Sequence, residues 1–136
     1  MVSSRRKSVL ALALALLATA LPLAAQVGHP AKGSWSGYWG PSPENKNRML
    51  LVLDWVEGQI VGTINPGPKG IKLAKTALDV STWTLTIEAD MPTSAGGTAR
   101  YVATGKLENL GSWTNRTYTG TYRFGDERGT FKLALN

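Results

Sequence analysis

Cysteine is absent from the 136-residue chain, and histidine occurs once, as His29. Without cysteine the protein forms no disulfide and carries no thiol for a lipid anchor, so an oxidising compartment leaves it unchanged. Zinc and copper sites need clusters of cysteine and histidine, which this sequence lacks. The sequence therefore predicts neither a metal site nor a bound cofactor.

The residues available for catalysis are also few. His29 lies beside a proline and ahead of the first expected strand, so we expect it to be solvated, whereas a catalytic base needs a rigid support. The carboxylate pairs Glu88/Asp90 and Asp126/Glu127 each share one strand face or one turn, but glycosidases need two carboxyls facing each other across a cleft. No glycine-rich phosphate loop leads from a strand into a helix. We therefore predict that the protein is not an enzyme.

The first 25 residues have the composition of a signal peptide. Residues 5–7 are Arg, Arg and Lys, and the uninterrupted apolar run Val9–Leu17 is shorter than the about 20 residues of a membrane-spanning helix. Small residues place the cleavage after Ala25 or after Ala20. Sec export and twin-arginine export both remain open, although Ser8 stands where the twin-arginine motif usually has a large apolar residue. We expect a periplasmic or secreted protein without integral membrane association after cleavage.

Cleavage after Ala25 leaves 111 residues, enough for a single domain. The signal peptide contains three of the 15 basic residues and none of the nine acidic ones, so the formal net charge falls from +6 to +3. A charge this mild and evenly spread along the sequence does not predict binding to nucleic acid. We expect a flexible lead over residues 26–33 and a β-barrel domain over residues 34–136.

Short runs in which apolar and polar residues alternate fill this domain, and a period of two residues is typical of half-buried strands. Turn residues rich in Gly, Pro and Asn separate the runs, and no helical stretch lies between them. The alternation slips near Lys75, as it does at a β-bulge. The eight runs are Ser34–Trp39, Arg48–Val56, Gln59–Ile64, Ile71–Leu78, Trp83–Ala89, Ala99–Leu107, Thr117–Phe124 and Gly129–Leu135.

These runs predict an all-β fold, a single eight-stranded antiparallel up-and-down barrel. The strands of an outer-membrane barrel alternate in the same way but need about 9–11 residues, and these runs are shorter, so a barrel with its apolar face inward is favoured. Glycines interrupt that face at Gly37, Gly62, Gly105 and Gly120, and we interpret them as corners of tight coiling. A barrel of this size has room for packed side chains or one small ligand.

The segment Gly33-Ser34-Trp35 resembles the opening Gly-x-Trp of the calycin group, which comprises lipocalins, fatty-acid-binding proteins and avidins. Residues 100–106 (RYVATGK) and 117–122 (TYTGTY), the latter followed by a turn at Gly125, are similar to avidin strands. The resemblance implies a small exported bacterial β-barrel domain of calycin type. The polar residues with which avidins hold biotin cannot be placed on this sequence, so the resemblance implies the fold and not biotin binding.

The loop lengths predict that one end of the barrel is open. Alternate loops of an up-and-down barrel emerge at the same end, and the loops after the first, third, fifth and seventh runs all exceed a two-residue turn. Of the five tryptophans, we interpret Trp35, Trp55 and Trp83 as core residues. Trp39 opens the loop over residues 40–47 and Trp113 lies in another loop, so these two are candidates for rim packing or ligand contact. We expect the rim of the mouth to contain Trp39, Pro41, Asn45, Asn65, Pro66 and Met91.

We therefore predict a binding module for a small, largely apolar or aromatic ligand, held by Tyr38, Trp39, Arg48 and Tyr101. Tyr38 and Arg48 flank the first mouth loop, where an arginine can pair with an anionic group. The first alternative is a protein-binding module, such as an inhibitor of a secreted hydrolase. The second is a structural domain of the envelope. The expected partners are thus a small apolar ligand or an exported protein, and not nucleic acid.

Overall fold

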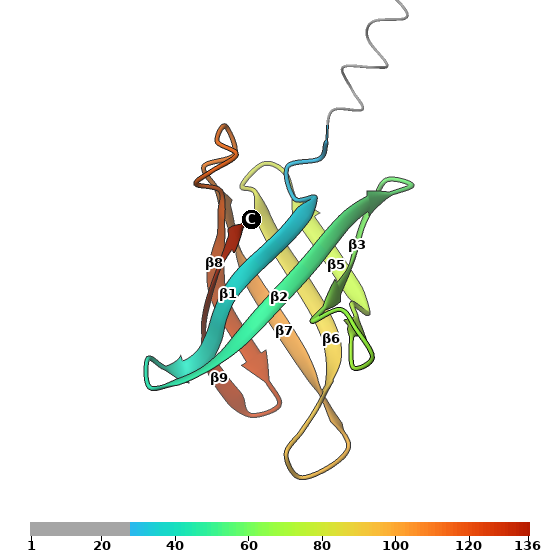
Figure 1. Cartoon of the computed structure of the whole chain (residues 1–136), viewed down its shortest axis with the longest axis vertical. Helices are drawn as coiled ribbons and strands as arrows, with labels where there is room; N and C mark the ends of the chain where they lie inside the picture. Colours follow the sequence, from blue (N-terminus) through green and yellow to red (C-terminus); the bar gives the residue numbers. More distant parts are fainter. Residues whose placement is uncertain (1–27) are drawn as a thin grey trace, which may run out of the picture.

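Nine antiparallel strands and the turns between them make up residues 28–136, the part of the chain that the computed structural model describes (Figure 1). The described part contains no helix, so the all-β prediction is confirmed. The signal peptide predicted for residues 1–25 lies outside the described residues. The strands are β1 (Gly33–Ser42), β2 (Asn45–Val56), β3 (Gln59–Ile64), β4 (Ile71–Lys72), β5 (Lys75–Asp79), β6 (Thr84–Pro92), β7 (Thr98–Glu108), β8 (Thr117–Phe124) and β9 (Glu127–Leu135).

Alternating burial along the strands explains why these segments form a sheet. In β6 the side chains of Leu85, Ile87 and Ala89 are buried, while the threonines and acidic residues between them are less buried. Successive side chains of a strand point to opposite faces, so each strand presents one apolar face to a shared core. The eight runs expected from the sequence all correspond to strands, and the fourth run corresponds to two.

The strands form one sheet in the order β4-β3-β2-β1-β9-β8-β7-β6-β5, so the first and last long strands of the domain, β1 and β9, are neighbours in its middle. The sheet curls until β3 packs against β5, but no backbone ladder joins these two strands. The prediction of a closed eight-stranded barrel is therefore wrong in two respects: the sheet has nine strands, and it is not closed by hydrogen bonding.

The fourth run explains both differences, because it changes partner midway. Ile71–Lys72 pairs with β3, whereas Lys75–Asp79 pairs with β6. At the junction, the N–H of Leu73 donates to a carbonyl of β3 at 3.0 Å and the N–H of Ala74 donates to a carbonyl of β6 at 2.7 Å. The slip expected near Lys75 is thus a complete change of neighbour. A short seam without backbone pairing remains between β3 and β5.

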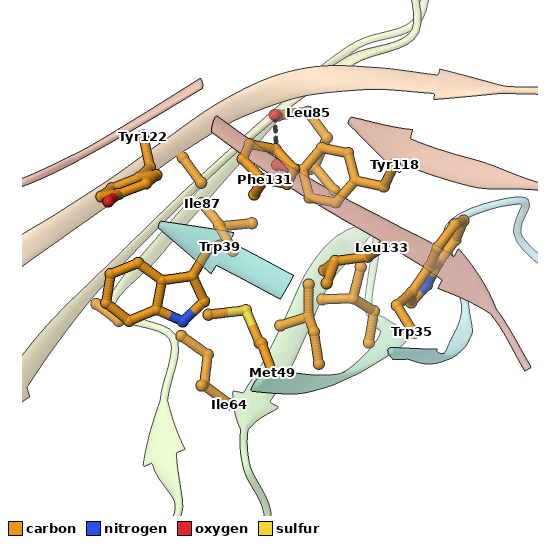
Figure 2. Packing of buried hydrophobic residues seen from close by; sticks show 14 of the residues in the cluster. Trp35, Trp39, Met49, Ile64, Leu85, Ile87, Tyr118, Tyr122, Phe131 and Leu133 are labelled. Carbon is orange, nitrogen blue, oxygen red and sulfur yellow. Dashed lines mark hydrogen bonds between the residues drawn. The ribbon is translucent and has the colours of Figure 1, made fainter. Parts of the chain in front are cut away.

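Aromatic and aliphatic side chains together fill the core inside the curled sheet (Figure 2). Trp35 and Tyr118 are fully buried with their rings edge to face, 6.4 Å apart, and the ring of Phe131 lies 4.7 Å from that of Tyr118. The buried hydroxyl of Tyr118 donates to the carbonyl of Leu85 at 2.7 Å, so its polar atom is satisfied. Burial raises the pKa of Tyr118 far above its ordinary value, which keeps the hydroxyl protonated as a donor.

Glycines allow neighbouring strands to approach closely where the sheet curls most. A Cβ at Gly37 would overlap the backbone carbonyl of Lys132 on β9, and a Cβ at Gly120 would overlap the carbonyl of Thr104 on β7. Strand glycines at such points of close backbone approach are typical of strongly coiled sheets. This agrees with the interpretation of these glycines as coiling positions.

We predict that Gly120→Ala destabilises the protein by about 2–4 kcal/mol, because backbone atoms of β7 have to move to admit the methyl group. Urea unfolding followed by tryptophan fluorescence measures this loss. Gly111→Ala is the matched control, since a Cβ there meets no atom within 4 Å, and it should change stability by less than about 0.5 kcal/mol. Equal stability of the two variants would contradict the packing argument.

Candidate functional site

The four residues predicted to bind ligand lie on two different faces of the sheet. Trp39 and Tyr101 point into the core, where their rings pack edge to face at 5.1 Å and are only 8% and 1% exposed. Tyr38 and Arg48 lie opposite each other on β1 and β2 and point to the outside. The structure thus does not bring the four together at one site: Tyr38 shares one hollow with Trp39 and another with Arg48, and Tyr101 lines neither.

The expected open mouth is filled by aromatic side chains. Trp39 belongs to β1 and not to a loop, and its ring packs edge to face against those of Tyr122 and Phe124, at 5.0 and 5.8 Å. Three of the four expected mouth loops are shorter than predicted, because the strands continue further than expected, and residues 93–97 join β6 to β7. Only residues 43–44 join β1 to β2, and only residues 125–126 join β8 to β9. Side chains and short turns therefore occupy this end.

Two tyrosine hydroxyls in this aromatic cluster differ in their surroundings. The hydroxyl of Tyr122 donates to Glu127 Oε2 at 2.8 Å, and burial followed by this bond raises the pKa of Tyr122. The hydroxyl of Tyr101 is buried without a hydrogen-bond partner, and burial raises its pKa strongly. A buried hydroxyl without a partner destabilises the fold. Tyr101 lines neither hollow beside Tyr38, whereas Trp39 lines the one of about 380 Å³ together with Tyr38.

A hollow of about 450 Å³ lies at the seam between β3 and β5. Apolar side chains that face inward from the β3 and β5 edges of the sheet line it, together with groups that can form hydrogen bonds. The hydroxyl of Thr76 on β5 donates to the carbonyl of Ile60 on β3 at 2.6 Å and fastens the seam at that point. The residues that define the hollow are His29, Trp55, Ile60, Leu73, Thr76 and Leu78.

Trp55 lines this hollow and is more exposed than Trp35 and Trp39, the two inward-facing tryptophans of the neighbouring strand β1. Its register on β2 is that of Leu51 and Leu53, which are buried, yet Trp55 is 44% exposed. The missing pairing between β3 and β5 leaves no strand to cover it. We expected Trp55 to be a core residue, and the structure shows that it is a half-exposed ring beside a hollow.

His29 stacks on this exposed ring. The two ring centroids are 4.3 Å apart with an angle of 14° between the planes, and the ring centroid of Trp83 lies 6.4 Å from that of His29. His29 is partly buried and not fully solvated as we expected, because the segment before β1 folds back onto the seam. Trp83 itself has φ of +53°, a left-handed conformation that is rare for a bulky residue. Strained backbone of this kind clusters at functional sites.

Residues 28–32, which we call the latch, hold His29 over the hollow. Ala31 is fully buried, and its carbonyl accepts a hydrogen bond from Trp35 Nε1 at 2.8 Å. The carbonyl of Pro30 accepts a hydrogen bond from Arg116 Nη1 at 2.9 Å. The N–H of Ala31 donates to Nδ1 of His29 at 3.1 Å, which fixes the ring orientation. Buried groups of the sheet thus position His29, a residue that belongs to no recognisable sequence motif.

Arg116 is the part of this arrangement that the sequence analysis missed entirely. It is a buried charged residue, and its other terminal nitrogen donates to the carbonyl of Leu110 at 2.6 Å. The guanidinium also lies over the ring of Trp113, 4.6 Å from its centroid. Its partner Pro30 is 86 positions away in the chain, so local sequence carries no signal for the contact.

The hollow is suited to binding and offers few groups for catalysis. An aromatic ring, aliphatic side chains and a few polar groups such as Gln59 and Lys75 line it. Nδ1 of His29 already accepts a backbone hydrogen bond, which restricts its use as a base. Within residues 28–136, no group of three or more His, Cys, Asp or Glu side chains is arranged to hold a metal ion. The same part of the chain has no helix long and apolar enough to cross a membrane.

We predict that the latch weakens at acidic pH. Burial lowers the pKa of His29 below its ordinary value of 6.5, so the folded state takes up this proton less readily than the unfolded chain. The contribution of His29 to stability is therefore complete above about pH 6.5 and is lost as the pH falls through the lower folded pKa. A protonated Nδ1 also cannot accept the N–H of Ala31.

Urea unfolding of the wild type and of His29→Phe between pH 5 and pH 8 measures this effect. The phenyl ring keeps an aromatic partner for Trp55 but does not titrate. The difference in unfolding free energy between the two proteins should shift in favour of the variant as the pH falls. A difference that stays constant over this range would contradict the role of His29.

A scan of protein-family models, a search of curated proteins and a search of solved structures each found no match to this chain. The resemblance to the calycin group thus has no support beyond the residues that suggested it. Because a fold alone does not imply a function, the functional argument depends on the geometry of the seam.

Proposed function

We propose that the protein is an exported, soluble, calycin-like binding module that holds a small, largely apolar or aromatic ligand in the hollow between β3 and β5. The observation that carries this proposal is Trp55, an inward-facing tryptophan that stays 44% exposed at the wall of a hollow of about 450 Å³. In this proposal residues 1–25 direct export and are removed, which places the mature protein in the periplasm or outside the cell.

The size and lining of the hollow support a small ligand. Pockets for small molecules measure about 300–1,000 Å³ and combine apolar walls with a few polar groups. Ile60, Leu73 and Leu78 supply apolar surface in this hollow, and Gln59 and Lys75 supply polar groups. A ligand with an aromatic ring and one polar or anionic substituent matches this composition.

The stacked pair of Trp55 and His29 supports an aromatic ligand in particular. Aromatic pairs contribute about 0.5–1.5 kcal/mol beyond the burial of their area. A flat ligand gains this contribution by stacking on Trp55, either beside His29 or in its place. The latch gives the site an element that can move, because His29 is partly buried and belongs to the segment that precedes the sheet.

Exposed valines around the hollow favour a protein partner as the second candidate. Val56, Val61 and Val80 are exposed, and two of them line the hollow. Exposed apolar residues around a concavity are typical of surfaces that accept an anchoring side chain from a partner. An inhibitor of a secreted hydrolase would use the surface in this way.

Binding of the fluorescent probe 1-anilinonaphthalene-8-sulfonate tests the small-ligand proposal. The probe should quench tryptophan fluorescence, and Trp55→Ala should weaken its binding about tenfold because the stacking surface is lost. Tyr38→Ala is the matched control: this ring is 46% exposed, lies on the outer face and does not line the hollow, so its loss should leave the affinity of the hollow unchanged. Equal affinities for the wild type and Trp55→Ala would contradict the proposal.

A further inference from the structure

The outer face of the sheet carries a row of cationic side chains across five adjacent strands. The register places Arg48 of β2 opposite Tyr38 of β1, Tyr38 opposite Lys132 of β9, Lys132 opposite Thr119 of β8, and Thr119 opposite Lys106 of β7. Every second position of this row is a cation. Because neighbouring strands are about 4.8 Å apart, these charges repeat at about 10 Å.

More cations flank this row on the same face. Lys46 lies over the ring of Tyr38, 5.2 Å from its centroid. Arg123 and Arg128 lie directly opposite each other on β8 and β9. Like charges in directly opposed positions destabilise a sheet. The fold therefore keeps these two arginines together at a cost in stability, unless an anion lies between them.

Carboxylates within the protein do not neutralise this face. The four ion pairs found among residues 28–136 use Lys32, Lys75 and Arg100 as their cations. Arg100 lies on the outer face of β7. None of the ion pairs includes the other six cations on this face, which are Lys46, Arg48, Lys106, Arg123, Arg128 and Lys132. The outer face of β2-β1-β9-β8-β7 also carries the carboxylates Asp54 and Glu108, but neither forms an ion pair with these six cations. The face is therefore cationic overall, and we call it the cationic face.

Three hollows follow one another on the cationic face, and each contains a free cation. The first, of about 570 Å³, contains Arg48, and the second, of about 380 Å³, contains Lys46 and Lys132. Tyr38 lines both of them and stands between them as a half-exposed ring. The third, of about 470 Å³, contains Arg123 and Arg128. A chain of repeating anionic units can place successive units in such a series.

We propose that the cationic face binds a linear, carboxylate-bearing polysaccharide. The guanidinium groups match the planar carboxylate in a bidentate geometry. The threonines between the cations provide hydroxyls for the hydroxyl groups of sugars, and they include Thr104, Thr119, Thr121 and Thr130. The ring of Tyr38 provides a flat surface for one sugar ring.

Other polyanions fit the cationic face less well. Proteins that bind single-stranded nucleic acid stack successive bases on several aromatic side chains, and Tyr38 is the one exposed aromatic residue here. Stable attachment to a membrane needs an apolar insertion in addition to basic residues. On this face the exposed large apolar residues are Tyr38, Leu50 and Val56, all on strands of the sheet and not on a projecting loop.

Calorimetric titration with polygalacturonate tests the proposal, using the double variant Arg48→Gln/Lys132→Gln. Both side chains are exposed, so the variant should fold, and it should bind about tenfold more weakly with a reduced salt dependence. The matched control is Lys69→Gln/Lys72→Gln, which removes the same charge from outside the cationic face. It should lose less than about twofold in affinity, and equal loss in both variants would overturn the proposal.

Tyr38→Ala and two competing probes separate the sugar from other anions. Tyr38→Ala should weaken binding to polygalacturonate without changing the salt dependence, because it removes a stacking surface and no charge. Binding of a single-stranded DNA oligomer, or of vesicles that contain phosphatidylglycerol, as tight as that of polygalacturonate would overturn the assignment to a polysaccharide. Absence of any binding to polygalacturonate at low salt would overturn it as well.

Discussion

The two hydrogen bonds donated by Leu73 and Ala74 determine how the sheet ends. One reaches the carbonyl of Gly62 on β3 and the next reaches the carbonyl of Glu88 on β6, so consecutive residues hold opposite edges of the sheet. Beyond this point each half of the fourth run has a neighbour on one side only. The hollow therefore follows from strand pairing itself, and a change in loop length elsewhere would not remove it.

The latch depends on the same core that the strands enclose. Its carbonyls are held by Trp35 and Arg116, which are both buried, and burying a guanidinium stabilises the fold only where its donors find acceptors. The two terminal nitrogens of Arg116 donate to backbone carbonyls, while its Nε has no hydrogen-bond partner. The position of His29 is thus coupled to the packing of the core, although its ring lies at the surface of the seam.

Alternation of apolar and polar residues was enough to predict the strands and their inward faces, because each strand is buried on one side. It could not predict the seam, since the period of two specifies a face and not a neighbour. Trp55 illustrates the limit: its register is that of a core residue, and only the missing pairing of β3 with β5 exposes it. Arg116 and Pro30 meet across the whole domain, and Trp39 lies within a strand that continues through glycine and proline.

The cationic face could not be predicted from the sequence, where the cations are evenly spread. They gather on one side of the sheet because they occupy every second position of their strands. Arg48 and Trp55 show how the two proposed surfaces are separated. They lie seven positions apart on β2, or about 23 Å along an extended strand, and they point to opposite faces. A ligand at the seam and a polymer on the outer face therefore do not compete for space. One strand can serve both surfaces because its two faces are chemically independent.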